Sequence, residues 1–204
     1  SRKLGFQPRR TMKVAQELYD GIEVDSLGAV GLITYMRTDS LRLSNESIKE
    51  AEEYIRSTWG EKYLPDKPRV FKSKSSAQDA HEAIRPTMPS FSPEKVKSSL
   101  SNDQYKLYKL IWDRFIACQM ANAIHSTTRA DIEANGYVFK ASGYIVTFDG
   151  YTVLYEESKD GDQEKESALP PLENGMIIRA KEIIPNQHFT QPPLRYTEAT
   201  LIKK

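Results

Sequence analysis

An apolar run that ends in a cluster of polar side chains constrains this chain more than any other stretch. Residues 30–33 read Val-Gly-Leu-Ile, which predicts a buried strand. The polar residues that follow then lie at the end of a rigid element, which is a common way to position reactive side chains. In an extended chain side chains alternate, so Tyr35, Arg37 and Asp39 share one face and Met36 takes the other.

A phenol beside a guanidinium points to covalent chemistry on phosphate. A tyrosine hydroxyl titrates near pH ~10, so it attacks poorly until a cation or a base favours the phenolate. Arg37 supplies such a charge, its planar fork fits phosphate oxygens, and Asp39 is placed to hold that fork. The side chains suit attack of Tyr35 on a phosphodiester. Spacing alone favours a half-buried tyrosine beside a surface ion pair, since structural ion pairs are common.

Three ordered motifs resemble those of one enzyme family. The sequence ITYMRTDS at residues 33–40 resembles the active-site signature of type IA DNA topoisomerases. The sequence AHEAIRP at residues 80–86 resembles the second signature of that family, and QPPLRYTEA at residues 191–199 resembles a third. Three motifs in this order across most of the chain are far more specific than any one of them.

The resemblance implies an α+β fold and an excised piece of a larger protein. Residues 1–122 are then a mainly helical DNA-gate domain, similar to helix-turn-helix or winged-helix domains, that carries the nucleophile. Residues 123–191 form part of a β-rich arch domain. Residues 192–204 begin a further helical domain, which the end of the chain cuts short.

The resemblance also implies an ATP-independent isomerase in which Tyr35 forms a transient 5′-phosphotyrosyl link with one DNA strand. Another strand passes through the break, which is then resealed. Arg37 offsets charge at the reacting phosphate, and His81 binds a phosphate near the scissile bond. The further DNA contacts that the match implies are Thr38, Asp39 and Arg85.

The family draws its metal from a part that we do not recognise in this chain. Its Toprim domain brings acidic residues, a lysine and magnesium, whereas transesterification needs no nucleotide. We therefore expect the magnesium ligands outside this chain, and no relaxation of DNA by the chain alone. The expected partners are single-stranded or negatively supercoiled DNA and the Toprim and other domains. The D-x-D-x-E pattern at residues 160–164 is typical of a solvated loop, because a Toprim carboxylate pair follows a buried strand.

Composition bounds the other classes of function. No apolar run approaches the roughly 20 residues of a membrane span, and residues 1–20 lack a signal peptide's apolar centre, which predicts a cytoplasmic, nucleoid-associated protein. The single cysteine, Cys118, excludes a disulfide framework and a cysteine-based zinc site. Residues 1–122 carry 20 Lys and Arg against 16 Asp and Glu, so the half with Tyr35 is basic although the net charge is only +1.

Two alternatives to a topoisomerase fragment differ in kind. One is a non-catalytic module that binds single-stranded DNA with its basic half. The other is a tyrosine recombinase, whose arginines and histidine precede the tyrosine. Here Arg37, His81 and Arg85 follow Tyr35, which argues against a recombinase.

Periodicity and capping residues predict the elements. A helix at 8–20 has Val14, Ala15, Leu18 and Tyr19 as its apolar stripe. A short helix at 76–85 places His81 and Arg85 on an exposed face and ends at Pro86. The remaining predicted helices begin near 44, 92 and 101, and strands are predicted at 128–134, 137–140, 144–148, 152–155 and 176–184, with a hairpin turn at Asn135-Gly136.

Overall fold

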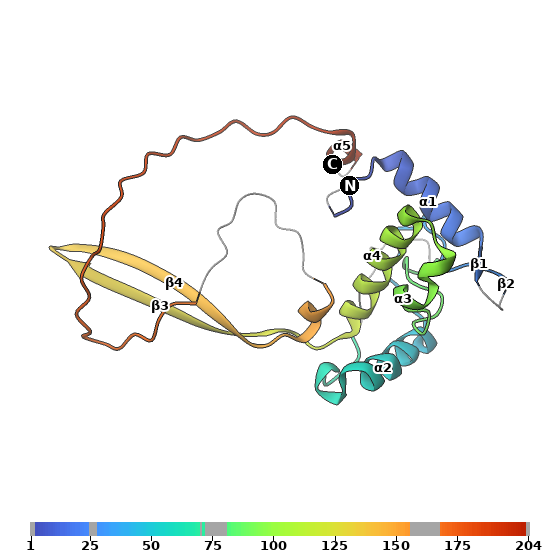
Figure 1. Ribbon diagram of the computed structural model, residues 1–204, viewed down its shortest axis with the longest axis horizontal. Helices are drawn as coiled ribbons and strands as arrows, with labels where there is room; N and C mark the ends of the chain where they lie inside the picture. The colour runs from blue at the N-terminus through green and yellow to red at the C-terminus, as the bar shows by residue number, and fades with distance from the viewer. Residues whose placement is uncertain (1–2, 25–27, 70, 72–80, 156–167, 203–204) are drawn as a thin grey trace. The chain divides into compact units, whose positions relative to one another are not determined.

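A computed structural model describes residues 3–24, 28–69, 71, 81–155 and 168–202 (Figure 1). The described residues of 1–124 and 148–159 form one unit, and those of 125–147 and 160–204 form another. Helices and strands both occur, so the α+β class is confirmed. The described residues include no helix that is long and apolar enough to cross a membrane. In chain order the elements are α1 Pro8–Asp20, β1 Ile22–Val24, β2 Gly28–Val30, α2 Asn45–Trp59, η1 Glu61–Tyr63, α3 Pro93–Val96, η2 Lys97–Ser99, α4 Asn102–Gln119, β3 Ile124–Ala134, β4 Tyr137–Phe148, η3 Gly150–Val153 and α5 Glu198–Ile202.

Local capping residues set the ends of the three long helices. Helix α1 begins with a proline and ends at Gly21. The hydroxyl of Ser44 accepts a hydrogen bond of 3.2 Å from the Ser47 amide at the start of α2. Ser101 and Gln104 form a reciprocal capping box at the start of α4, with bonds of 3.3 and 2.9 Å. The helices predicted from these residues are confirmed.

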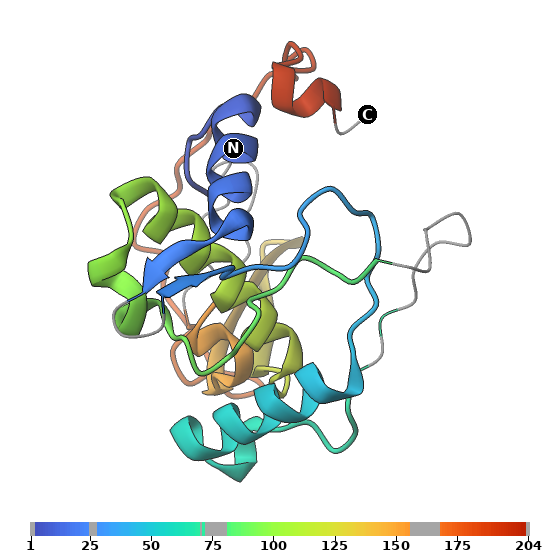
Figure 2. The same ribbon diagram turned by 90° about the vertical axis from the view of Figure 1, so that its right-hand side faces the viewer.

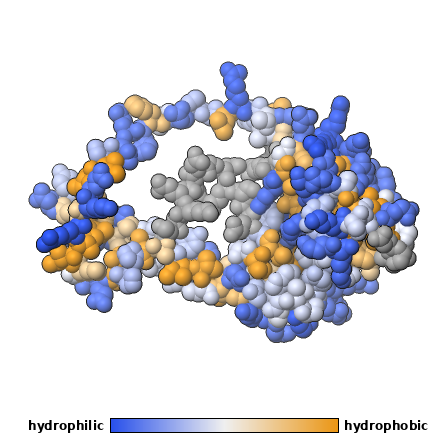
Figure 3. Space-filling view, viewed as in Figure 1, coloured by the Kyte–Doolittle hydropathy of each residue, from blue (hydrophilic) through white to orange (hydrophobic). Residues whose placement is uncertain are grey.

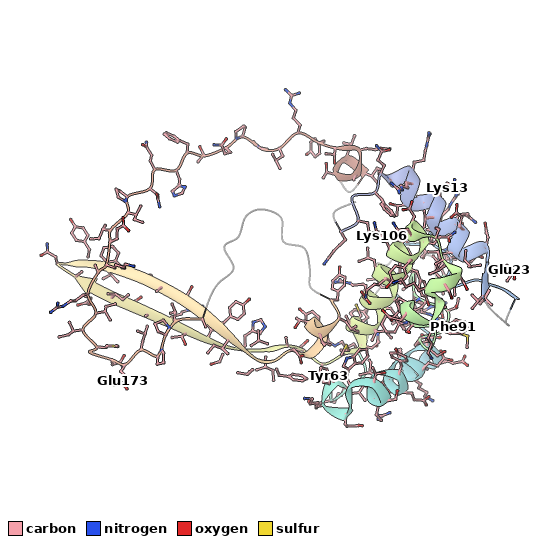
Figure 4. The ribbon with its side chains drawn as sticks, viewed as in Figure 1. Lys13, Glu23, Tyr63, Phe91, Lys106 and Glu173 are labelled. Atoms are coloured by element: carbon pink, nitrogen blue, oxygen red, sulfur yellow. The ribbon has the colours of Figure 1, made fainter. Side chains whose placement is uncertain are left out.

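The core of the first unit lies where α1 and α2 pack against α4, an arrangement that Figures 1 and 2 both show. The phenol of Tyr108 is buried within α4 and donates a hydrogen bond of 2.6 Å to the carbonyl of Phe91, which Figure 4 labels. Burial raises the pKa of Tyr108. The indole of Trp112 donates to the Pro89 carbonyl at 3.0 Å. These aromatic residues are core, and their polar atoms are satisfied inside it.

Strands β3 and β4 form a two-stranded hairpin in the second unit. Its turn is Asn135-Gly136, with φ angles of 51° and 83°, which confirms the predicted hairpin signal. The predicted strands at 137–140 and 144–148 are one continuous strand. Large hydrophobic side chains remain exposed on the hairpin, as Figure 3 shows; they are Tyr137, Val138, Phe139, Ile145 and Val146.

Two strands predicted after residue 148 are wrong. The residues predicted as a strand at 152–155 contribute to the 3-10 helix η3 instead. Residues 176–184 are irregular and largely exposed, and no partner strand lies beside them in the described part of the chain. Apolar β-branched residues favour a strand, but the strand forms only where a neighbouring strand pairs its amides and carbonyls.

Two hydrogen bonds attach Asp149 and η3 to Tyr63 and Ala121 after the hairpin returns, and a third joins Tyr63 to Ala121. The phenol of Tyr63, labelled in Figure 4, donates to the Asp149 carboxylate at 2.8 Å, and this bond raises the pKa of Tyr63. The Ala121 amide donates to the Tyr63 carbonyl at 2.7 Å, and the Tyr151 amide donates to the Ala121 carbonyl at 3.0 Å. The chain therefore leaves and re-enters this unit at a fixed point.

A Gly150→Ala substitution should destabilise this attachment strongly. Gly150 has a φ of 50°, and a Cβ there would lie 2.5 Å from the backbone carbonyl of Asn122. Left-handed strain of about 1–2 kcal/mol and overpacking of about 1–3 kcal/mol should together lower the free energy of unfolding by roughly 2–5 kcal/mol. Urea denaturation measures the change.

The matched control is Gly5→Ala, because Gly5 has a φ of 66° but a Cβ there meets nothing within 4 Å. It carries backbone strain without the clash. Equal losses of stability in the two variants would show that close packing at Gly150 does not matter.

Candidate nucleophile site

Two segments that lie about fifty residues apart in the sequence run side by side at the site (Figure 2). The Thr34 amide donates to the Arg85 carbonyl at 2.9 Å, and the Thr87 amide donates to the Leu32 carbonyl at 3.0 Å. The Thr34 hydroxyl donates to the Ala83 carbonyl at 2.7 Å. The first two signature motifs therefore form one structural unit.

This pairing explains why the secondary structure predicted for both motifs is wrong. The strand predicted at 30–33 ends at Val30, and beyond it only a single bridge joins Ile33 to Pro86. Proline has no amide hydrogen, so a ladder cannot continue through it. Residues 81–85 of the helix predicted at 76–85 are not helical, because their backbone groups bond across to the first motif; residues 76–80 lie outside the described residues.

Side chains after Ile33 still alternate as predicted for an extended chain. Met36 is buried against the core, whereas Tyr35, Arg37 and Asp39 are exposed. Tyr35 keeps 38% of its surface accessible. The buried residues hold the segment, and the three polar residues of the first motif face solvent, where a substrate can reach them.

Two rings contact the ring of Tyr35. The His81 ring lies 5.4 Å from it between centroids, and the Tyr19 ring lies 5.5 Å from it in an edge-on arrangement. The predicted phosphate ligand and the predicted nucleophile are therefore neighbours in space. The spacing predicts Tyr19 in the buried stripe of its helix, but 40% of its surface is exposed and its ring contacts Tyr35.

Arg37 and Asp39 do not form the ion pair that their spacing suggests. Within the described residues no hydrogen bond or ion pair joins the two side chains, although both are exposed and close in sequence. The guanidinium of Arg37 is thus available to an external anion. The surface ion pair that we considered as an alternative is absent here.

Two of the other predicted DNA contacts, Thr38 and Arg85, form hydrogen bonds within their own loops. The Thr38 hydroxyl accepts a bond of 3.0 Å from the Ser40 amide and closes a tight turn. The Arg85 guanidinium donates to Glu82 at 2.8 and 3.1 Å and to the Pro86 carbonyl at 2.9 Å, and its side chain is only 12% exposed. Most N–H donors of the Arg85 guanidinium therefore have partners within the protein, whereas the Arg37 side chain is exposed to solvent.

The described residues do not provide a metal site. They contain no group of three or more His, Cys, Asp or Glu side chains placed to hold a metal ion. The acidic run at 160–164 lies outside the described residues. The third motif, at 191–199, lies in the other unit, where irregular chain leads into α5.

Comparisons with known proteins agree with the motifs. The sequence profile of a family described as DNA topoisomerase matches residues 1–204. DNA topoisomerase 1 of Rickettsia felis is 50% identical over 208 aligned residues, which cover all of this chain and 27% of that protein. DNA topoisomerase 1 of Rickettsia prowazekii is 49% identical with the same coverage. The chain therefore spans about a quarter of the length of these relatives.

A solved structure is similar as well. Full-length topoisomerase I from Thermotoga maritima superposes with a TM-score of 0.70 at 37% sequence identity. The match covers 86% of this chain and 27% of that one.

Proposed function

The chain belongs to the DNA topoisomerase family, and from that membership we propose that it is the part of a type IA enzyme that carries the nucleophile. The observation that carries the proposal is the ring contact between Tyr35 and His81, which come from two separate motifs, with the exposed Arg37 two residues after Tyr35. The substrate is a single strand of DNA, which negative supercoiling makes accessible. The activity belongs to the longer protein.

Tyr35 is the nucleophile in this proposal. Its oxygen forms a bond to the phosphorus of one phosphodiester, and the bond from that phosphorus to the 3′ oxygen breaks. The phenol gives up its proton, and the 3′ oxygen takes one up as it leaves. Because the DNA phosphate stays on the tyrosine, the reverse attack by the 3′ hydroxyl restores the strand without an energy source.

Arg37 stabilises the charge on the phosphate as it passes through its five-coordinate state. The guanidinium is exposed and belongs to the residue two positions after Tyr35, at a bend of the backbone. It has no ion pair with Asp39 to break before it binds phosphate. A fixed cation of this kind acts where charge develops, so its effect falls on the chemical step.

His81 holds a DNA phosphate beside the reacting one. Its ring packs against Tyr35, so a phosphate bound to its ring nitrogens lies near the nucleophile. Thr38 and Arg85 hold the loops that carry these groups, and Asp39 remains a proposed contact with DNA. We propose that the ligands of the magnesium ion implied by the resemblance lie in the rest of the longer protein, because this chain spans about a quarter of the length of its relatives.

A covalent adduct tests the proposed function. The longer protein that contains this chain is incubated with single-stranded DNA, and the complex is denatured and digested with protease. The peptide that carries DNA should be the one that contains Tyr35, with the DNA joined through its 5′ phosphate. An adduct at any other residue would refute the assignment.

A His81→Phe substitution should weaken DNA binding by about tenfold, the order expected when a hydrogen bond to a charged group is lost. Phenylalanine keeps the ring packing against Tyr35 and removes both nitrogens. The cleavage rate at saturating DNA should stay close to that of the unmodified protein. Fluorescence anisotropy with a labelled oligonucleotide measures the affinity.

The control for His81 is His188→Phe, because His188 is exposed and lies in the other unit. It should bind DNA normally. If His81→Phe binds with full affinity but cleaves slowly, His81 acts on the chemical step and the assigned role is wrong.

A further inference from the structure

Tyr19 has an unusual position for an aromatic residue near the end of a helix. It is the last residue but one of α1, and it follows Leu18, which is fully buried. Its own ring projects from the core, with 40% of its surface accessible, and meets the Tyr35 ring edge-on at 66°. The core does not require this ring, so its contact with Tyr35 needs another explanation.

The backbone fixes the distance between the two tyrosines. The Leu32 amide donates to the Leu18 carbonyl at 2.8 Å, which ties the end of α1 to the segment that carries Tyr35. Gly31 lets these segments approach, because a Cβ there would lie 2.7 Å from the Tyr19 carbonyl oxygen. Tyr19 therefore belongs to a rigid helix whose last turn is hydrogen-bonded to Leu32, three residues before Tyr35.

The contact restricts how the Tyr35 ring can turn. The rings of Tyr19 and His81 both contact the Tyr35 ring before any DNA is bound. An edge-on aromatic pair favours one arrangement over its alternatives by roughly 2- to 10-fold in population. A nucleophile held in its reactive orientation loses less entropy when the phosphate arrives.

We propose that Tyr19 is a positioning residue that sets the orientation of Tyr35 through ring contact. This inference rests on the proposed function of Tyr35. Tyr19 acts through its ring and not through its hydroxyl, because no hydrogen bond joins the two phenols among the described residues. It makes no bond to DNA in this role.

The test compares Tyr19→Ala with Tyr19→Phe in the longer protein. Single-turnover cleavage is measured at saturating single-stranded DNA, and affinity is measured separately. Tyr19→Ala should cleave roughly 2- to 10-fold more slowly with unchanged affinity, since the orientation of Tyr35 is no longer held. Tyr19→Phe keeps the ring and should restore the full rate. The control on the same helix is Met12→Ala, because Met12 is 41% exposed and lies seven residues before Tyr19 in α1.

Each other outcome overturns the inference. Normal cleavage by Tyr19→Ala would show that the contact has no role, and lower affinity at a normal rate would make Tyr19 a DNA contact. A defect shared by Tyr19→Phe would assign the role to the hydroxyl. Failure of the proposed function is distinguishable, because then the unmodified protein itself forms no adduct at Tyr35.

Discussion

A Tyr35→Phe substitution in the longer protein should abolish the covalent adduct with DNA and with it all relaxation of supercoiled plasmid. Phenylalanine keeps the ring contacts with Tyr19 and His81, so the segment should fold unchanged. Only the oxygen that attacks phosphorus is lost. Among the described ring contacts, Tyr35 is the tyrosine that touches His81 of the second motif. Without the phenol oxygen the covalent bond to phosphorus cannot form, so DNA cleavage should not occur.

The adduct is measured with DNA labelled at its 3′ end, because a 5′-phosphotyrosyl link leaves that part of the strand on the protein. Labelled protein is resolved on a denaturing gel, and topoisomers of a negatively supercoiled plasmid are resolved in parallel. Tyr137→Phe, which removes a phenol from the exposed hairpin, should behave like the unmodified protein. Adduct formation by Tyr35→Phe at a comparable level would end the assignment.

An Arg37→Ala substitution should slow cleavage by about 10²–10³ when DNA is saturating, the range seen when a fixed electrostatic donor at the reacting centre is removed. The side chain is exposed and unpaired within the described residues, so its removal leaves no buried charge behind. Thermal unfolding should therefore stay unchanged. The loss should appear in the chemical step, with a smaller effect on DNA affinity.

Single-turnover kinetics over a range of DNA concentrations separates the two effects. Arg42→Ala is the matched control: its side chain is exposed in the same loop, and its structural bonds use the backbone carbonyl and amide, which alanine retains. Arg37→Lys should recover only part of the rate, because an ammonium cannot bind phosphate with two parallel bonds. A normal rate for Arg37→Ala at saturating DNA would remove this residue from the chemical step.

Helices with their own start and stop signals could be predicted from the sequence. Pro8 and Gly21 bound α1, and Ser44 and Ser101 supply oxygens to the first amides of α2 and α4. The hairpin turn at Asn135-Gly136 belongs to the same class. In each case the deciding contacts lie within a few residues of one another, so local sequence contains the information.

Elements that depend on a distant partner were predicted wrongly. Residues 81–85 have helical spacing, but the backbone groups of Ala83 and Arg85 form hydrogen bonds with Thr34 instead of with one another. Residues 176–184 have strand composition without a strand beside them in the described structure. The division of the chain into domains at 122 and 191 and the DNA-binding role of Arg85 remain predictions.

The candidate site divides in the same way. The sequence by itself predicted Tyr35, Arg37 and His81 as site residues, because motifs record residue types in order, and it predicted the burial of Met36 between two exposed residues. Only the tertiary structure decided that His81 and Tyr19 flank Tyr35 and that Arg85 is bound within its own loop. Those contacts join residues that are far apart in the chain or on different faces of an element, and packing of the whole unit selects them.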